Sequence, residues 1–226
     1  MTMHLLDNIA WHSLSGPHLK YSSGTSEARR YASGFSAIIG FSNLNSPDFA
    51  ALVEVCLPGE QFYCGGLAGE VPHGWRIEAE TTMNQMVWDA APPAANGELV
   101  AHRLGPDHVP QILELVAITQ PGPFAERTIE LGEYYGVFAG EQLVAMAGER
   151  MVAGPLREIS GVCTHPDFQG RGLARHLVEK LIRLEMQHNK IPFLHVRQDN
   201  DRARRIYEKM GFRHHQERVV QVVSRQ

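Results

Sequence analysis

Apolar and polar residues follow two different periodicities between residues 159 and 184. Residues 159–164 form a short, apolar and partly β-branched run, which predicts a buried strand. Beyond it, the turn from Gln169 to Ala174 contains Gly170 and Gly172. Apolar residues then recur at the spacing of a helix face, at Leu173, Ala174, Leu177, Val178, Leu181, Ile182 and Leu184. The pattern predicts a strand, a glycine-rich turn and a helix in direct succession.

A second strand and helix are predicted further along the chain. Residues 193–196 have the composition of a strand, Asn200 is a suitable helix cap, and Gly211 is the expected stop. One face of this helix carries Ala203, Ile206, Tyr207 and Met210. A right-handed crossover would set the two strands parallel and side by side, so we expect Tyr207 to face the sheet.

Residues 90–97 are rich in Pro, Ala and Gly, a composition typical of a linker. Before the linker we expect a helix at 46–57, begun by Asn45 or Ser46, and strands at 61–67 and 81–87. We therefore predict a division of the chain into residues 1–95 and 96–226.

After the linker, Asp107 is expected to cap a helix. The apolar side of this helix consists of Val109, Ile112, Leu115 and Val116. A loop at 119–123 and a second helix at 124–131 follow. Strands at 135–139 and 143–147 then predict a hairpin.

Composition narrows the class of protein. The 226 residues are 43% hydrophobic with a net charge of −4, which gives no reason to expect nucleic acid as a partner. No apolar run approaches the length of a membrane span and the first residues lack a basic region, so we expect a cytoplasmic protein without a membrane partner. Three cysteines without a C-x-x-C pair argue against a disulfide framework, and the absence of an H-E-x-x-H pair predicts no metal site.

The glycine-rich turn is the main candidate for chemistry. Glycine allows strained dihedrals, and the first N–H groups of a helix have no partner within the helix, so Gly170 and Gly172 favour binding of a pyrophosphate. Arg171 and Arg175 either reach a phosphate or lie on a solvated helix face. A Rossmann dinucleotide enzyme would carry a third glycine at position 175, where this chain has arginine.

Two motifs in this order resemble those of the GNAT acyltransferases. Gln169, Gly172 and Ala174 match the cofactor signature Q/R-x-x-G-x-G/A. The stretch N-x-x-A-x-x-x-Y-x-x-x-G-F is matched by Asn200, Ala203, Tyr207, Gly211 and Phe212. The resemblance covers residues 96–226. It implies an α/β (α+β) fold in which helices flank a mixed central sheet with splayed parallel strands, beside a smaller N-terminal α/β region.

The resemblance also implies acetyl transfer from acetyl-CoA to a primary amine, carried by a small molecule or a peptide. The cofactor would be held by Val162, Cys163, Thr164, Gln169, Gly170, Arg171, Gly172, Leu173, Ala174, Arg175, Asn200 and Tyr207, with backbone groups of Val162 and Thr164 paired to the pantetheine arm. The acceptor would border Pro121, Gly122, Pro123, Phe124 and His195. An acyl-CoA-binding regulatory module without turnover is the alternative.

An alkyl amine needs a base to lose its proton, and Glu158 has the offset from Gln169 at which histone-type members of the family carry their catalytic glutamate. The alternative interpretation is that Glu158 is a solvated charge at the end of a strand, paired with Arg157. Tyr207 would protonate the leaving thiolate, or is simply a core aromatic residue. His195 lies mid-strand beside the cleft, where it could take a proton from the acceptor.

The first ninety residues carry no such motif. They either cover the acceptor cleft or form the surface of a homodimer. Ala28–Tyr31 faintly resembles Ala203–Tyr207, as a degenerate second copy of the fold would, but the spacing to the following Gly-Phe differs, so chance explains the match better.

Overall fold

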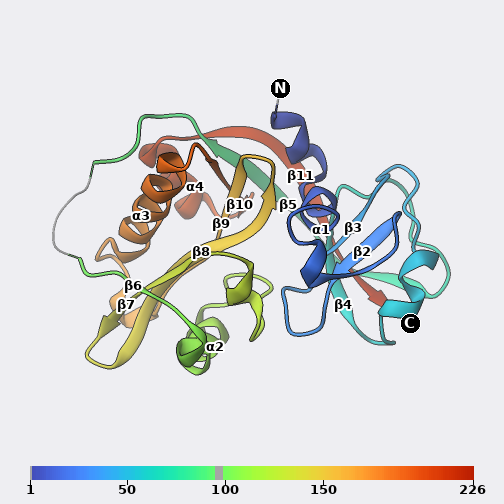
Figure 1. Ribbon diagram of the computed structural model, residues 1–226, viewed down its shortest axis with the longest axis horizontal. Coiled ribbons are helices and arrows are strands. Elements are labelled where there is room, and N and C mark those ends of the chain that lie inside the picture. The colour runs from blue at the N-terminus through green and yellow to red at the C-terminus, as the bar shows by residue number, and fades with distance from the viewer. Residues whose placement is uncertain (1, 95–98) are drawn as a thin grey trace.

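The computed structural model describes residues 2–94 and 99–226, and within them the strands form two sheets (Figure 1). The larger sheet has eight strands in the order β4-β11-β5-β10-β9-β8-β7-β6, and the smaller has the order β1-β2-β3. The strands of the larger sheet are β4 (Gln61–Gly65), β5 (Trp75–Trp88), β6 (His102–Arg103), β7 (Tyr134–Ala139), β8 (Gln142–Ala153), β9 (Leu156–Thr164), β10 (Ile191–Arg197) and β11 (Phe212–Arg225). Neighbouring strands are antiparallel except β9 and β10, which are parallel. The predicted mixed sheet with one parallel pair is confirmed.

Three α-helices from the C-terminal part of the chain pack on this sheet: α2 (Val109–Thr119), α3 (Leu173–Gln187) and α4 (Asp201–Met210). Helix α3 buries Leu173, Leu177, Val178, Leu181 and Ile182 in the largest core cluster, as its periodicity predicts. The side chain of Asn200 accepts from Ala203 N at 3.1 Å, and Gly211 ends α4 at φ 122°. On the predicted inner face of α4, Ile206 is 42% exposed, so only Ala203, Tyr207 and Met210 pack against the core.

Three predicted helices differ from the structure. The stretch 46–57 contains only a short 3₁₀ helix, Ala50–Val55, and Asp48 rather than Asn45 or Ser46 accepts from its backbone, at Ala51 N. Asp107 does not cap α2, because it lies inside a 3₁₀ turn, Pro106–His108, that precedes the helix. The helix predicted at 124–131 is reduced to the 3₁₀ turn Thr128–Leu131. Short 3₁₀ turns satisfy few backbone groups and give only weak periodicity in the sequence.

The N-terminal region begins with the 3₁₀ helix Met3–Asn8, here called the N-terminal segment, and continues into α1 (Ile9–Leu14). A 3₁₀ turn at Leu19–Tyr21 leads into the small sheet, which consists of β1 (Ser22–Gly24), β2 (Ala28–Tyr31) and β3 (Ile39–Phe41). A further 3₁₀ turn, Pro166–Phe168, follows β9 in the other part of the chain. Because β2 is a strand whereas Ala203–Tyr207 is helical, the sequence likeness between them is not a repeat of one structural unit.

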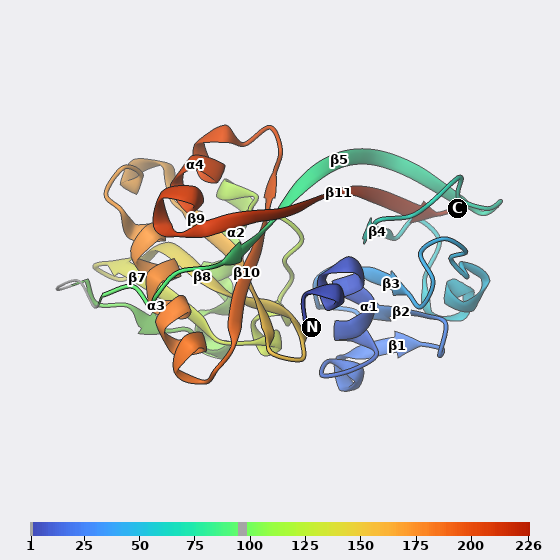
Figure 2. The ribbon, with the colours of Figure 1, turned by 90° about the horizontal axis from the view of Figure 1, so that it is seen from above.

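Both halves of the chain contribute to the larger sheet. Strands β5 and β11 run from one lobe to the other as a long bent ribbon (Figure 2), paired from Trp88 and Phe212 to Trp75 and Arg225. β4 pairs with the other edge of β11. The sheet therefore crosses the predicted division at residue 95, and separate roles for the two segments stay a prediction. Residues 95–97 of the predicted linker lie outside the described residues.

A buried hydrogen-bond cluster fixes α1 against β8. The hydroxyl of Ser13 accepts from Val152 N at 3.0 Å and lies 3.2 Å from both the Tyr31 hydroxyl and Nδ1 of His18. Burial lowers the pKa of His18 to about 4, which keeps this ring neutral near pH 7. In residues 2–94 and 99–226, no helix combines the length and apolar character needed to cross a membrane.

On β8, the buried carboxyl of Glu149 makes stability depend on pH. Its pKa is raised to about 9, first by burial and then by the neighbouring carboxyl of Glu185. The pKa in the folded state lies above the ordinary 4.5, so folding favours the protonated carboxyl. The stabilisation that this proton gives is complete below the pKa of a free carboxyl and is lost as the pH rises toward 9. We expect the wild-type melting temperature to fall by several degrees between about pH 6 and pH 9, and that of Glu149→Gln to stay level. Thermal unfolding followed by circular dichroism at several pH values measures these melting temperatures, and Glu141→Gln, at an exposed position, is the control. If the melting temperatures of wild type and Glu149→Gln changed equally with pH, the prediction would be wrong.

Candidate active site

The glycine-rich turn has the conformation that an anion site requires. Gly170 and Gly172 have φ values of 77° and 76°, in the left-handed region, and an added Cβ at either would meet no atom within 4 Å. Gly172 is the N-cap of α3 and supplies no side-chain bond, so the first N–H groups of the helix stay open. The turn thus combines an accessible backbone with the positive end of a 15-residue helix, which fits the diphosphate of coenzyme A.

Side chains around the turn divide into two groups. Leu173 and Cys163 are buried, and only their backbone groups can face a ligand. Arg171 and Arg175 are exposed. Arg171 lies over the Phe168 ring and donates to Asp167 O, and Arg175 pairs with Glu179 at 2.8 Å. Both arginines lie near enough to the turn to reach a phosphate, but each has a protein partner in the structure.

Strands β9 and β10 part before β9 reaches this turn. They pair at Leu156, Arg157 and Glu158 only, after which β9 stays with β8 and β10 stays with β5. His165 N donates to Val144 O in β8, so the alternation of the ladder turns the backbone groups of Thr164 toward the gap. A bulge at Gly161, with φ 62°, bends β9 at the same place. The predicted splay is present.

A pocket of about 810 Å³ opens at the splay. Val162, Asn200, Ala203 and Tyr207 line the end near α4. At the other end, the lining comes from the N-terminal segment, α1, β4, β5 and β11, including Leu6, Asp7, Asn8, Tyr63, Met83 and Arg218. The N-terminal region therefore forms a wall of the pocket.

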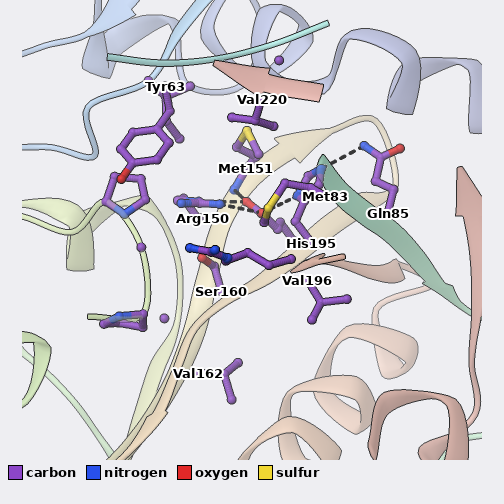
Figure 3. Close-up of a pocket in the computed structure, with 18 of the residues that line it drawn as sticks. Tyr63, Met83, Gln85, Arg150, Met151, Ser160, Val162, His195, Val196 and Val220 are labelled. Carbon is purple, nitrogen blue, oxygen red and sulfur yellow. Dashed lines mark hydrogen bonds and ion pairs between the residues drawn. The ribbon is translucent and has the colours of Figure 1, made fainter. Parts of the chain in front are cut away.

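A row of hydrogen-bonded side chains crosses the floor of the pocket (Figure 3) and extends beyond the pocket lining to Gln216. Each of five neighbouring strands contributes one residue to this polar row: Arg150 (β8), Glu158 (β9), His195 (β10), Gln85 (β5) and Gln216 (β11). Arg150 Nη2 and Nε donate to the two carboxylate oxygens of Glu158 at 2.8 and 3.0 Å, and His195 Nδ1 lies 2.7 Å from Oε1.

Glu158 is neither solvated nor paired with Arg157, and its partner is Arg150. Its side chain is 1% exposed, and Met151 N adds a fourth hydrogen bond at 3.2 Å. Burial alone would raise the pKa of this carboxyl, but the Arg150 charge and the His195 hydrogen bond outweigh it and lower the pKa to about 2. The carboxylate is thus a weak proton acceptor that is fully occupied in orienting its neighbours.

Tyr207 faces the pocket from α4, with its ring edge-to-face against Phe212 at 5.7 Å. Burial raises the pKa of its hydroxyl to about 12, so the group carries its proton at all ordinary pH values. Asn200 lines the pocket too, but its carbonyl oxygen is used in capping α4, which leaves its amide NH₂ for a ligand. Gln169 donates to Thr164 O at 3.4 Å and closes the turn against β9.

Comparison with known proteins gives the family. The family model described as FR47-like protein matches residues 134–220. A crystal structure assigned to the GNAT acetyltransferases, from Novosphingobium aromaticivorans DSM 12444, is 30% identical, covers 99% of both chains and has a TM-score of 0.89. The chain belongs to the GNAT acetyltransferase family.

Two further proteins resemble this GNAT chain, one in sequence and one in fold. The N-alpha-acetyltransferase RimI of Mycobacterium tuberculosis is 35% identical over 82 residues, which span 35% of this chain and 51% of that enzyme. A GCN5-related N-acetyltransferase-like protein from Streptococcus suis is 14% identical with a TM-score of 0.61 over 96% of this chain and 92% of that one, which shows the shared fold. The predicted family and fold class are confirmed, and GNAT acetyltransferases in general take acetyl-CoA as the acetyl donor.

In this GNAT chain, the predicted acceptor loop borders the pocket through Pro121, Gly122 and Pro123. Phe124 instead packs edge-to-face on Tyr134 at 5.6 Å and supports the loop from behind.

Several residues of the site escaped the sequence motifs, namely Arg150, Gln85, Gln216, Arg218, Tyr63 and the N-terminal segment. Arg150 did leave a signal, because Glu149 and Arg150 interrupt the otherwise apolar run of β8, and buried charges demand partners. The contributions of β4, β5, β11 and the N-terminal segment depend on pairing across the whole chain and carry no local signal.

Proposed function

We propose that this protein transfers the acetyl group of acetyl-CoA to a primary amine of a small molecule or a peptide. The observation that carries the proposal is the parting of β9 from β10 at a pocket lined by His195 and Tyr207, with the glycine-rich turn leading from β9 into α3. Acetyl-CoA, when bound, supplies a thioester whose carbonyl carbon the amine attacks and whose sulfur leaves. Gly170, Gly172 and the first N–H groups of α3 would hold its diphosphate, and backbone groups of Val162 and Thr164 its pantetheine arm.

Deprotonation of the amine is assigned to the pair of Glu158 and His195. Because Glu158 is ionised and saturated with hydrogen bonds, it serves to hold His195, and the imidazole takes the proton directly or through water. This division of labour modifies the role of general base predicted for Glu158. Tyr207, whose hydroxyl stays protonated, supplies the proton to the departing sulfur.

The test is release of thiol from acetyl-CoA in the presence of a panel of amines, together with calorimetric binding of acetyl-CoA. The panel includes amino acids, peptide α-amines, lysine side chains and aminoglycosides, since fold alone does not choose between acceptors. Peptide α-amines have an added reason, because the mycobacterial relative is an N-alpha-acetyltransferase. Turnover with one class supports the proposal. Tight binding without turnover on any amine would favour an acyl-CoA-binding module, and absence of binding would contradict both.

Tyr207→Phe is expected to lower kcat by about 10²-fold, in the range attributed to a single general acid, and to leave acetyl-CoA affinity nearly unchanged. Phenylalanine preserves the ring contact with Phe212, so the fold should persist. Stopped-flow measurement of thiol release checks the rate. The matched control is Tyr135→Phe on β7, whose hydroxyl lies 3.5 Å from Glu133 and outside the pocket lining. Equal rates for both variants would remove Tyr207 from the mechanism.

A further inference from the structure

Gln85, in the polar row, is bound on three sides and is 1% exposed. Its Nε2 lies 3.0 Å from Nε2 of His195 and 3.2 Å from the backbone oxygen of Leu6, and its Oε1 accepts from Gln216 at 2.7 Å. Leu6 belongs to the N-terminal segment, so this one amide connects the wall of the pocket to the imidazole on its floor.

The partners of Gln85 decide which way its amide points. A glutamine amide can be assigned only from its hydrogen bonds, because its nitrogen and oxygen look alike. A backbone carbonyl accepts and never donates, so the group facing Leu6 must be the NH₂ group. The same NH₂ group therefore donates to Nε2 of His195, which must be an acceptor with a free lone pair.

The other ring nitrogen of His195 is fixed by the opposite neighbour. Glu158 is an ionised carboxylate and can only accept, so Nδ1 of His195 carries a proton and donates it at 2.7 Å. The two partners together define one state of the ring, namely neutral, protonated on Nδ1 and bare on Nε2. Of the charged and titratable groups facing this ring, Glu158 and Arg150 belong to the polar row, while Asp7, Tyr63, Arg197, Tyr207 and Arg218 line the surrounding pocket.

We propose that Gln85 is a positioning residue that presets His195 in this proton-accepting state, and that the carbonyl of Leu6 sets the direction in which Gln85 acts. The inference rests on the proposed function, since it concerns the base of that reaction. When Nε2 gains a proton it can no longer accept, so Gln85 must turn its oxygen toward the ring and release Leu6. Proton uptake at the base is thereby linked to the seating of the N-terminal segment on the pocket.

The ring state is read first in the wild-type protein. Nitrogen-15 NMR of histidine-labelled protein, assigned with His195→Gln, distinguishes the two neutral tautomers without any need for turnover. We expect His195 to carry its proton on Nδ1 when neutral. A neutral ring protonated on Nε2 would overturn the proposal. If no amine is acetylated while the Nδ1 proton is found, the proposed function fails and the assignment of Gln85 stands.

Gln85→Glu tests the direction of the hydrogen bond. A carboxylate cannot donate to Nε2 but accepts from it, so the imidazolium would lie between two carboxylates. We expect the titration midpoint of His195 to rise by at least about 1 pH unit, a tenfold change, with the rising limb of kcat/KM moving by the same amount. Hydrogen exchange in residues 3–8 should become faster because Leu6 loses its donor.

The matched control is Gln142→Glu, the same change at an exposed position in the hairpin between β7 and β8. This variant should shift neither the titration midpoint of His195 nor the rising limb of kcat/KM. An unchanged midpoint in folded Gln85→Glu would overturn the proposal, and if that variant does not fold, the wild-type spectrum decides alone.

Discussion

Glu158→Gln is expected to lower the free energy of unfolding by about 3–5 kcal/mol, because it leaves the guanidinium of Arg150 buried without its counter-charge. The side chain of Arg150 is only 12% exposed, so water cannot replace the lost partner. We also expect kcat/KM to fall by at least about 10²-fold, since His195 loses the carboxylate that orients it. Urea denaturation followed by fluorescence measures the first effect, and thiol release measures the second.

Two companion variants separate charge burial from general damage. Adding Arg150→Met to Glu158→Gln removes the orphaned charge and should recover at least half of the lost stability without restoring activity. Glu133→Gln breaks an exposed ion pair with Arg103 and should change stability by less than about 1 kcal/mol. If Glu158→Gln were as stable as Glu133→Gln, the polar row would not be held together by this ion pair.

Gly170→Asp is expected to weaken binding of acetyl-CoA by about 10–100-fold, measured by titration calorimetry. The added carboxylate stands beside the open N–H groups of α3 and repels a bound diphosphate. The space around Gly170 is free, so the loss of stability should be limited to the left-handed backbone, about 1 kcal/mol.

Gly140→Asp is the matched control. Gly140 has a φ of 62° and equally open surroundings, but it lies in the hairpin turn between β7 and β8. The two variants should lose similar stability while only Gly170→Asp loses affinity. A similar affinity in both variants would place the cofactor elsewhere on the molecule.

The sequence was most informative where structure is local. The turn at Gly170 and Gly172, the start of α3 at Leu173 and the cap at Asn200 all depend on neighbouring residues, and each was predicted at its observed place. The parallel pairing of β9 and β10 also followed, because handedness restricts a crossover between successive strands.

The sequence was least informative where residues distant along the chain meet. Glu158 was predicted as a base from its position, but its partner Arg150 and the resulting low pKa depend on the register of β8 against β9. Gln85 showed no pattern of its own, because its role arises from Leu6 and His195. Short 3₁₀ turns such as Ala50–Val55 were overestimated as helices, since their few apolar residues fit either form.

The position of β11 between β4 and β5 constrains the order in which the protein can be completed on the ribosome. Strands β4 and β5 are synthesised first, but they join one sheet only through β11, which follows β5 by more than a hundred residues. Until then the edges of β4 and β5 that face β11 stay unpaired, a condition that favours association with other nascent chains and recruits chaperones. The part of the larger sheet formed by β4, β5 and β11 is thus expected to assemble late in folding.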